Sequence, residues 1–263
     1  MDHVEVAGMR IAFERAGVGP PLVLVHGAVC DRRVWRYQLD ALSDEFTVVA
    51  WDAPGCGGSA DPPESFRLRD YADALAGFIA ALGLGRPHLL GHSFGGALLL
   101  ELYRRHPAVP PTLILVASTA GWAGSLPGAE VEQRLTFALD VADRLPGKFE
   151  PTSMRGLFSK VMSPETVDGL VAIMSEIRPV ATRAMAHALA EADLRDVLMT
   201  IDVPTLLIYG DADERSPLSV AEDLRDGIPG SRLVVMAGLG HECYLESPEP
   251  FNAEVRGFLQ SVA

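Results

Sequence analysis

Short apolar segments alternate with longer amphipathic ones along the first half of this 263-residue chain, and this alternation constrains the fold most strongly. The apolar segments are rich in Val, Leu and Ile and are bounded by Gly, Pro or polar residues, a pattern typical of buried strands. They span residues 22–25, 46–50, 88–90 and 113–116. Helices are predicted between them at residues 34–43, 68–82 and 95–106. This order predicts the α/β class, with a mostly parallel sheet and helices on both of its faces.

The middle of the chain, residues 122–195, interrupts this alternation. Prolines divide it into short helical segments, and it contains no convincing strand pattern. The alternation then resumes with strands predicted at residues 205–209 and 232–236 and helices at 218–227 and 250–262. We therefore expect one α/β core, made of residues 1–121 and 196–263, that carries residues 122–195 as a helical cap or lid insertion.

Charge and cysteine content restrict the expected partners and compartment. The net charge is −13, which repels phosphate backbones and anionic lipid, so neither nucleic acid nor a membrane is expected as a partner. Residues 1–15 hold no apolar signal segment, and no apolar run reaches the roughly 20 residues of a membrane helix. Cys30, Cys56 and Cys243 have no C-x-x-C spacing and are interpreted as small packing residues in loops near the site. We expect a reducing, cytoplasmic compartment and no metal.

One segment between a predicted strand and a predicted helix has the pattern G-x-S-x-G. It reads Gly91-His92-Ser93-Phe94-Gly95. In this context the serine lies on a sharp turn that exposes its hydroxyl, and the glycines let backbone segments approach closely. The N-terminus of the following helix favours negative charge nearby. Ser93 is therefore the predicted nucleophile.

A serine hydroxyl needs a neighbouring base, usually a histidine that a carboxylate orients. After an elbow of this kind the acid comes next in the chain and the histidine last. His106 ends the helix after the elbow, and His187 lies in the middle segment. His241 instead follows a predicted strand in a glycine-rich loop, at the sheet edge where ligands bind in open α/β sheets. His241 is the predicted base.

Three carboxylates follow the strand predicted at residues 205–209, and each is a candidate for the acid. They are Asp211, Asp213 and Glu214. Asp213 is the first choice and Asp211 the second. One of these acids is expected to shape the loop instead, because Asp commonly bonds to nearby backbone groups.

Acyl-transfer chemistry also needs backbone N–H groups that stabilise a developing oxyanion. One is expected from Phe94, directly after the nucleophile. The other is expected from Ala28, in the loop His26-Gly27-Ala28 after the first predicted strand. His26 is then interpreted as a residue that braces this loop and not as a base.

Taken together, these segments resemble the α/β-hydrolase superfamily along almost the whole chain. In chain order the matching segments are residues 26–28, Trp35, residues 52–59, 91–96, 210–217, 240–241 and 246–249. In that family the carboxylate four residues before a proline is usually the acid, which favours Asp213 before Pro217. The resemblance implies an eight-stranded, mostly parallel sheet, a helical cap and no cofactor. Family members that open epoxides or displace halide carry Asp at the nucleophile position, so Ser93 argues against both reactions.

The predicted substrate contacts are Trp35 and Trp122, with Met154 and Met162 from the middle segment. Aromatic rings and flexible thioethers line adaptable apolar pockets. The competing interpretation is that these side chains pack the helices and the core.

The leading hypothesis is a serine hydrolase that cleaves a small, largely apolar carboxylic ester or lactone through an acyl-enzyme. One alternative is hydrolysis of a carbon–carbon bond in a diketone-type substrate with the same three residues. The other is a hydrolase-like receptor that binds a small ligand and turns it over slowly or not at all.

Overall fold

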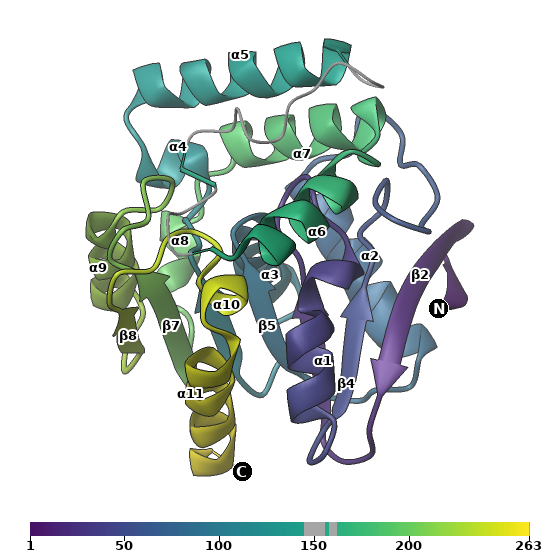
Figure 1. The fold of residues 1–263 in the computed structure, drawn as a ribbon, viewed down its shortest axis with the longest axis vertical. Helices are drawn as coiled ribbons and strands as arrows, with labels where there is room; N and C mark the ends of the chain where they lie inside the picture. Colours follow the sequence, from purple (N-terminus) through teal and green to yellow (C-terminus); the bar gives the residue numbers. More distant parts are fainter. Residues whose placement is uncertain (145–155, 158–161, 263) are drawn as a thin grey trace.

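A computed structural model describes residues 1–144, 156–157 and 162–262 of the chain (Figure 1). Its centre is an eight-stranded sheet with the order β1-β2-β4-β3-β5-β6-β7-β8. The strands are β1 (Asp2–Val6), β2 (Met9–Ala16), β3 (Pro21–Val25), β4 (Thr47–Trp51), β5 (His88–His92), β6 (Leu113–Val116), β7 (Thr205–Gly210) and β8 (Arg232–Met236). From β4 to β8 all neighbouring strands are parallel, whereas β2 pairs antiparallel with both β1 and β4. The predicted eight-stranded, mostly parallel sheet is confirmed.

The first two strands are the part of the sheet that the residue pattern did not predict. They form an antiparallel pair at the sheet edge, and in β1 only Val6 is buried. The charged side chains of β2, including Arg10, Glu14 and Arg15, interrupt its apolar residues. A strand that faces water on one side alternates apolar and polar residues, so it lacks the continuous apolar run of the central strands.

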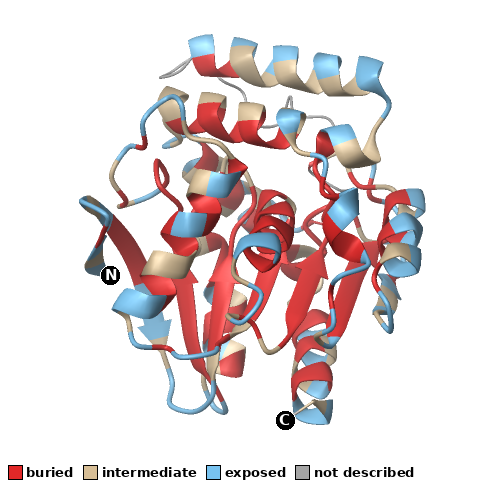
Figure 2. Cartoon of the chain, turned by 180° about the vertical axis from the view of Figure 1, so that it is seen from behind, coloured by how far each residue is buried: buried red, intermediate tan, exposed pale blue. Residues whose placement is uncertain are grey.

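Alternate residues of the central strands belong to two separate hydrophobic cores, one on each face of the sheet. In β3, Val23 and Val25 belong to one core, while Leu22 and Leu24 belong to the other. Helices α2 (Leu68–Ala81) and α3 (Phe94–Arg105) cover the first face, and α1 (Arg36–Leu42) and α11 (Pro248–Ser261) cover the second. Seen from behind in Figure 2, the central strands are buried along their length. Parallel strands need this double cover because both of their faces are apolar.

Short helices complete the loops around the sheet. They are η1 (Arg32–Trp35), α8 (Arg195–Leu198), α9 (Leu218–Gly227) and α10 (Cys243–Glu246). None of the helices in the described parts of the chain is both long and apolar enough to cross a membrane.

The middle segment supplies helices above one end of the sheet. They are α4 (Trp122–Ser125), α5 (Gly128–Arg144), α6 (Pro164–Met174) and α7 (Pro179–Glu191). The described residues between 122 and 195 contain no strand. Helix α5 packs along α7, and Figure 1 shows the two stacked beyond the end of the sheet.

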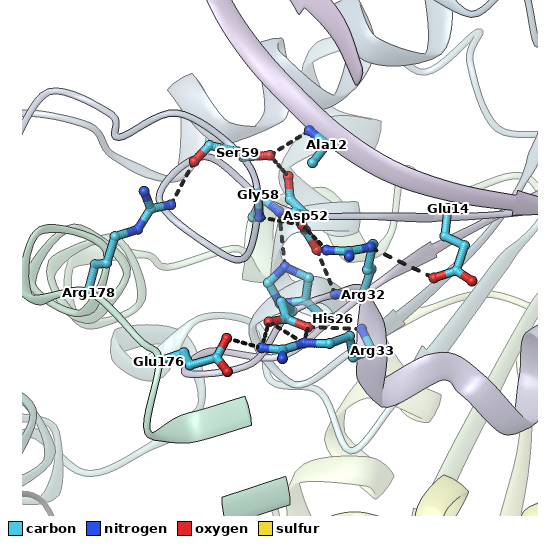
Figure 3. A network of polar contacts seen from close by, with 12 residues as sticks. Ala12, Glu14, His26, Arg32, Arg33, Asp52, Gly58, Ser59, Glu176 and Arg178 are labelled. Atoms are coloured by element: carbon cyan, nitrogen blue, oxygen red, sulfur yellow. Dashed lines mark hydrogen bonds and ion pairs between the residues drawn. The ribbon is translucent and has the colours of Figure 1, made fainter. Parts of the chain in front are cut away.

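A buried ion pair joins the loops that follow β3 and β4 (Figure 3). Asp52 is fully buried, and its Oδ2 accepts from Arg32 Nη1 at 2.6 Å and from the N–H of Gly58 at 2.8 Å. Its Oδ1 accepts from the backbone N–H of Arg32 at 2.8 Å. The carboxylate therefore fixes both loops at the sheet end where the helices of the middle segment lie.

The same network ties the start of α7 to the core. Arg178 donates from Nε to the carbonyl of Gly55 at 2.9 Å and from Nη2 to the carbonyl of Ser59 at 2.7 Å. Arg33 donates to Glu176 at 2.8 Å. Figure 3 shows Arg178 and Glu176 of the middle segment reaching across to Ser59 and Arg33 in the loops of the sheet. These contacts hold the beginning of α7 in a defined position over the core.

Asp52→Ala is expected to lower the free energy of unfolding by about 3–5 kcal/mol, because it leaves the largely buried guanidinium of Arg32 without its main partner. Chemical denaturation followed by circular dichroism measures this change. Glu14→Ala is the matched control, since Glu14 lies 3.8 Å from the same guanidinium but is half exposed. Its expected cost is below about 1 kcal/mol. Equal losses for the two variants would contradict the importance given to the buried carboxylate.

Candidate active site

Ser93 occupies the sharp turn between β5 and α3. Its backbone angles are φ 51° and ψ −112°, a conformation that non-glycine residues rarely adopt. Its N–H donates to the carbonyl of Val116 on β6 at 2.8 Å, which holds the strained turn against the sheet. The 12-residue helix α3 begins at the next residue, Phe94. Ser93 therefore lies between a strand and a helix N-terminus, as its motif predicts.

Close backbone contacts explain the two glycines of the motif. A Cβ on Gly91 would lie 2.5 Å from the carbonyl oxygen of Gly95, and a Cβ on Gly95 would lie 2.2 Å from the carbonyl oxygen of Val25. Both obstacles are backbone atoms of packed elements, so neither can turn aside as a flexible side chain could. The glycines let β3, the turn and α3 pack together around Ser93.

The loops after β7 and β8 bring Asp213 and His241 together. His241 Nδ1 lies 2.8 Å from Asp213 Oδ2, and both side chains are buried. Asp213 Oδ1 accepts the backbone N–H groups of Arg215 at 2.7 Å and Ser216 at 2.9 Å. An ionised carboxylate can only accept, so His241 donates from Nδ1, and in the neutral ring Nε2 keeps its lone pair.

The environment of Asp213 favours its charged form. Burial by itself would raise the pKa of Asp213, but attraction to His241, the hydrogen bond with His241 and the two backbone donors outweigh it. The pKa of Asp213 is therefore lowered from its ordinary value. The resulting carboxylate is suited to stabilise the positive charge that a histidine gains when it accepts a proton.

The competing residues lie elsewhere and make other contacts. Asp211 is exposed, and its Oδ1 accepts the N–H of Gly238 at 2.6 Å, so it shapes the loop as expected of one of these acids. His106 Nε2 lies 2.8 Å from Oδ1 of Asp73 at the surface. His187 faces a glutamate of its own helix, with 3.7 Å between the nearest atoms.

His26 braces the loop after β3. Its Nε2 accepts the N–H of Ala53 at 3.0 Å, so the proton resides on Nδ1, which lies 2.7 Å from the carbonyl oxygen of Gly27. Burial lowers the pKa of His26, which favours this neutral ring. Both ring nitrogens are engaged with backbone groups, so the interpretation of His26 as a bracing residue is supported.

The two predicted N–H donors of the oxyanion site belong to neighbouring backbone segments. Ala28 follows the loop that His26 braces, and it lines the same cavity as Ser93. Phe94 is the first residue of α3, and its fully buried ring packs edge-on against Tyr71 with 5.3 Å between ring centroids. This packing fixes the peptide that carries the Phe94 N–H.

A buried polar cluster that the sequence analysis did not single out lies beside His241. His92 Nε2 is 3.1 Å from the carbonyl oxygen of His241 and 3.8 Å from Oε2 of Glu242. Burial, with a smaller contribution from His241, holds the pKa of His92 well below its ordinary value, and burial raises the pKa of Glu242. Their positions directly before Ser93 and directly after His241 are the signals that could have identified them.

These three side chains also form the one group within the described ranges whose composition would allow metal binding. One ligand atom from each of His92, His241 and Glu242 can be chosen so that all lie within 4.8 Å of one another. His241 already bonds to Asp213 through its other nitrogen. One nitrogen of each histidine in this group is therefore already engaged, that of His241 with Asp213 and that of His92 with the His241 carbonyl.

A cavity of about 870 Å³ lies between these loops and the helices α5 and α7. Ser93, His241 and Ala28 line it together, which brings the predicted nucleophile, base and one oxyanion donor to a common space. Trp122 also lines it. The other apolar lining residues include Phe137, Val141, Leu157, Met185, Ala186 and Leu189. The lining also includes polar side chains on α5, among them Glu130, Gln133 and Arg134.

The remaining predicted substrate contacts are placed differently. The prediction that Trp35 contacts the substrate is corrected by the structure. Trp35 is fully buried, packs on Tyr244 with 4.5 Å between ring centroids, and is not part of the cavity lining. Met162 is buried but is not part of the lining, and Met154 falls outside the described residues. Met185 of α7 contributes the thioether that the lining does contain.

The three cysteines are buried in the structure, and burial holds the pKa of each thiol well above its ordinary value. Thiolates are the reactive form of cysteine. We expect iodoacetamide at neutral pH to leave Cys30, Cys56 and Cys243 unmodified in the native protein and to modify all three after unfolding. Intact-protein mass spectrometry counts the adducts. Rapid native labelling at any one of them would contradict the packing role.

The chain thus has an α/β architecture, a serine on the turn between a strand and a helix, and a buried pair of an aspartate and a histidine. The sequence profile of the alpha/beta hydrolase family matches residues 22–254, and the chain belongs to this family. The family and the fold expected from the sequence are confirmed.

Several proteins are similar to this chain over nearly its full length. It is 30% identical over 259 residues to the AB hydrolase superfamily protein YisY of Bacillus subtilis, which covers 96% of each chain. It is also 30% identical over 259 residues to the pimeloyl-[acyl-carrier protein] methyl ester esterase of Aeromonas hydrophila, covering 95% of this chain and 100% of that one. Among solved structures, a thermophilic esterase from Thermogutta terrifontis superimposes with a TM-score of 0.87 at 29% identity, covering 100% of this chain and 99% of that chain.

Proposed function

We propose that this protein is a serine hydrolase that cleaves a carboxylic ester or lactone of a small, largely apolar substrate. The observation that carries the proposal is the 2.8 Å contact between Asp213 and His241, which lines the same cavity as Ser93. Two of the similar proteins are named esterases, which supports the ester class.

In the proposed reaction, Ser93 Oγ attacks the substrate carbonyl while His241 Nε2 takes the hydroxyl proton. Asp213 holds the His241 ring and stabilises its positive charge. The N–H groups of Ala28 and Phe94 stabilise the oxyanion of the tetrahedral intermediate. His241 then gives the proton to the leaving alcohol oxygen, and an acyl-enzyme forms on Ser93.

The second half of the reaction uses the same groups in reverse. Water enters as the nucleophile, and His241 removes one of its protons as the water oxygen attacks the acyl carbonyl. The proton then returns to Ser93 Oγ as the carboxylic acid leaves. His241 mediates every proton transfer in this cycle, the backbone N–H groups only donate hydrogen bonds, and no cofactor takes part.

The lining of the cavity supports an apolar acyl group. Its volume of about 870 Å³ lies within the usual range for small-molecule sites, and side chains such as Met185 and Leu189 of α7 give it apolar surface. We assign residues 122–195 the role of a cap, because α5 and α7 supply much of this lining. A cap of this kind selects the substrate and excludes water from the acyl group.

Fluorophosphonate labelling with peptide mapping tests the proposed nucleophile. We expect one adduct, on Ser93, and loss of ester hydrolysis in proportion to its formation. An active enzyme fully modified at Ser93 would refute the proposal.

A matched substrate panel then tests the reaction class. Esters and lactones of increasing acyl length are compared with a diketone of the same size, and kcat/KM is expected to be highest for an ester or lactone. A higher kcat/KM for the diketone would instead assign carbon–carbon bond hydrolysis to this protein. Stoichiometric binding without turnover of any member would instead indicate a receptor.

A further inference from the structure

The imidazole of His92 contacts three parts of the site at once. It belongs to the residue directly before Ser93, its Nε2 lies 3.1 Å from the carbonyl oxygen of His241, and its Nδ1 lies next to Gly27. A Cβ on Gly27 would approach that nitrogen to 2.7 Å. One buried ring therefore links the nucleophile turn, the loop of His241 and the loop that carries Ala28.

The polarity of the contact with His241 fixes the protonation of the ring. A carbonyl oxygen can only accept, so His92 Nε2 carries the proton and donates it, and Nδ1 keeps its lone pair. Nδ1 is buried and makes no hydrogen bond within the described part of the chain. A second proton there would enter a buried ring that lies beside the His241 ring, with 4.8 Å between the two ring centroids. The ring is therefore held as a neutral, single donor.

The loop that carries His241 needs such an anchor. It contains Gly238 and Gly240, whose missing side chains leave the backbone free to adopt many conformations. The N–H of Gly240 bonds to Glu246 at 2.8 Å, and the Asp213 contact orients the ring of His241. The hydrogen bond from His92, which directly precedes Ser93, connects the backbone of His241 to the nucleophile turn.

We propose that His92 is a positioning residue, which sets the distance between Ser93 and His241 by donating from Nε2 to the His241 carbonyl. The inference rests on the proposed serine-hydrolase function. Errors of about 1 Å in the placement of catalytic groups cost on the order of 10²-fold in rate. Loss of the donor should therefore lower kcat far more than it changes KM.

The test compares two substitutions of similar size. His92→Leu removes the donor, whereas the amide nitrogen of His92→Gln can reach the position of Nε2. We expect His92→Leu to lower kcat for an ester about 10²-fold, to change KM less than about threefold, and to slow fluorophosphonate labelling as much as kcat. His92→Gln should recover most of both rates. If the Leu variant does not fold, His92→Asn replaces it, because its shorter amide cannot reach the carbonyl.

Gln38→Leu is the matched structural control. Gln38 is buried and donates to the carbonyl of Tyr244 at 3.2 Å, so it anchors the same segment three residues further on without lying beside Ser93. We expect this variant to lower Tm while leaving the labelling rate unchanged.

Two outcomes would overturn the inference, and a third tests the proposed function. Wild-type kcat and labelling in His92→Leu would overturn it, as would equal losses in the Leu and Gln variants that simply follow Tm. Activity in Ser93→Ala would instead overturn the proposed function itself. An inactive Ser93→Ala with a fully active His92→Leu would leave the function standing and remove only the positioning role.

Discussion

Ser93→Ala is expected to lower kcat for ester hydrolysis by about 10⁵–10⁶-fold, since residues that act as one catalytic unit lose most of their effect when the nucleophile is removed. The cavity and its donors remain, so substrate should still bind with an affinity close to that of the native protein. Steady-state kinetics with an active-site titration measures the loss and excludes contamination by native enzyme.

The strained turn provides the structural check on this variant. Alanine meets the same strain as serine at φ 51°, so Ser93→Ala should unfold at nearly the native temperature. Ser118→Ala is the matched control, because Ser118 is buried next to Gly96 on α3 but lies outside the proposed reaction. Its kcat should stay within a few-fold of the native value. Near-native turnover in Ser93→Ala would disprove the proposed mechanism.

Asp213→Asn is expected to lower kcat about 10⁴-fold, the scale seen when an amide replaces the acid of such a triad. The backbone N–H groups of Arg215 and Ser216 fix one carboxylate oxygen of Asp213 as an acceptor. An amide in this place keeps its oxygen there and turns its NH₂ group toward His241. The donor then forces His241 to accept at Nδ1 and to protonate Nε2, which removes the base.

Asp211→Asn provides the comparison for the acid. Asp211 is exposed and contacts only the N–H of Gly238 among the hydrogen bonds of the described residues, so an amide oxygen can replace its carboxylate. We expect kcat within about threefold of the native value for this variant. The pH dependence of kcat/KM for both variants distinguishes loss of the base from loss of stability. A larger effect at Asp211 than at Asp213 would reverse the assignment of the acid.

The sequence predicted the central sheet well because its strands are buried on both faces. The segment at residues 113–116, for example, is buried throughout and was located with the bounds that the structure has. Strands β1 and β2 were missed as individual elements, since about half of their side chains face water and only the pairing of β1 with β2 and of β2 with β4 reveals them. Local pattern is informative where burial is complete and loses information at a solvated edge.

The acid–histidine pair was also accessible from the sequence, because its members follow strands whose ends meet at one edge of the sheet. The cavity lining was not. The large aromatic ring of Trp35 suits a pocket, yet in the structure Trp35 lies on η1 and packs in the core against Tyr244. His92 and Glu242 were overlooked because their contacts depend on how two distant loops fold against each other.

The hydrogen bond between His92 and His241 joins residues 149 positions apart. As the ribosome makes the chain, the turn with Ser93 can form once β3, β5 and β6 have emerged. The acid and the histidine arrive only with the last quarter of the sequence. A chain that stops before Asp213 would lack both groups proposed to activate Ser93, so the proposed hydrolytic activity should appear only once the residues up to His241 have been made, and should not rise gradually with length.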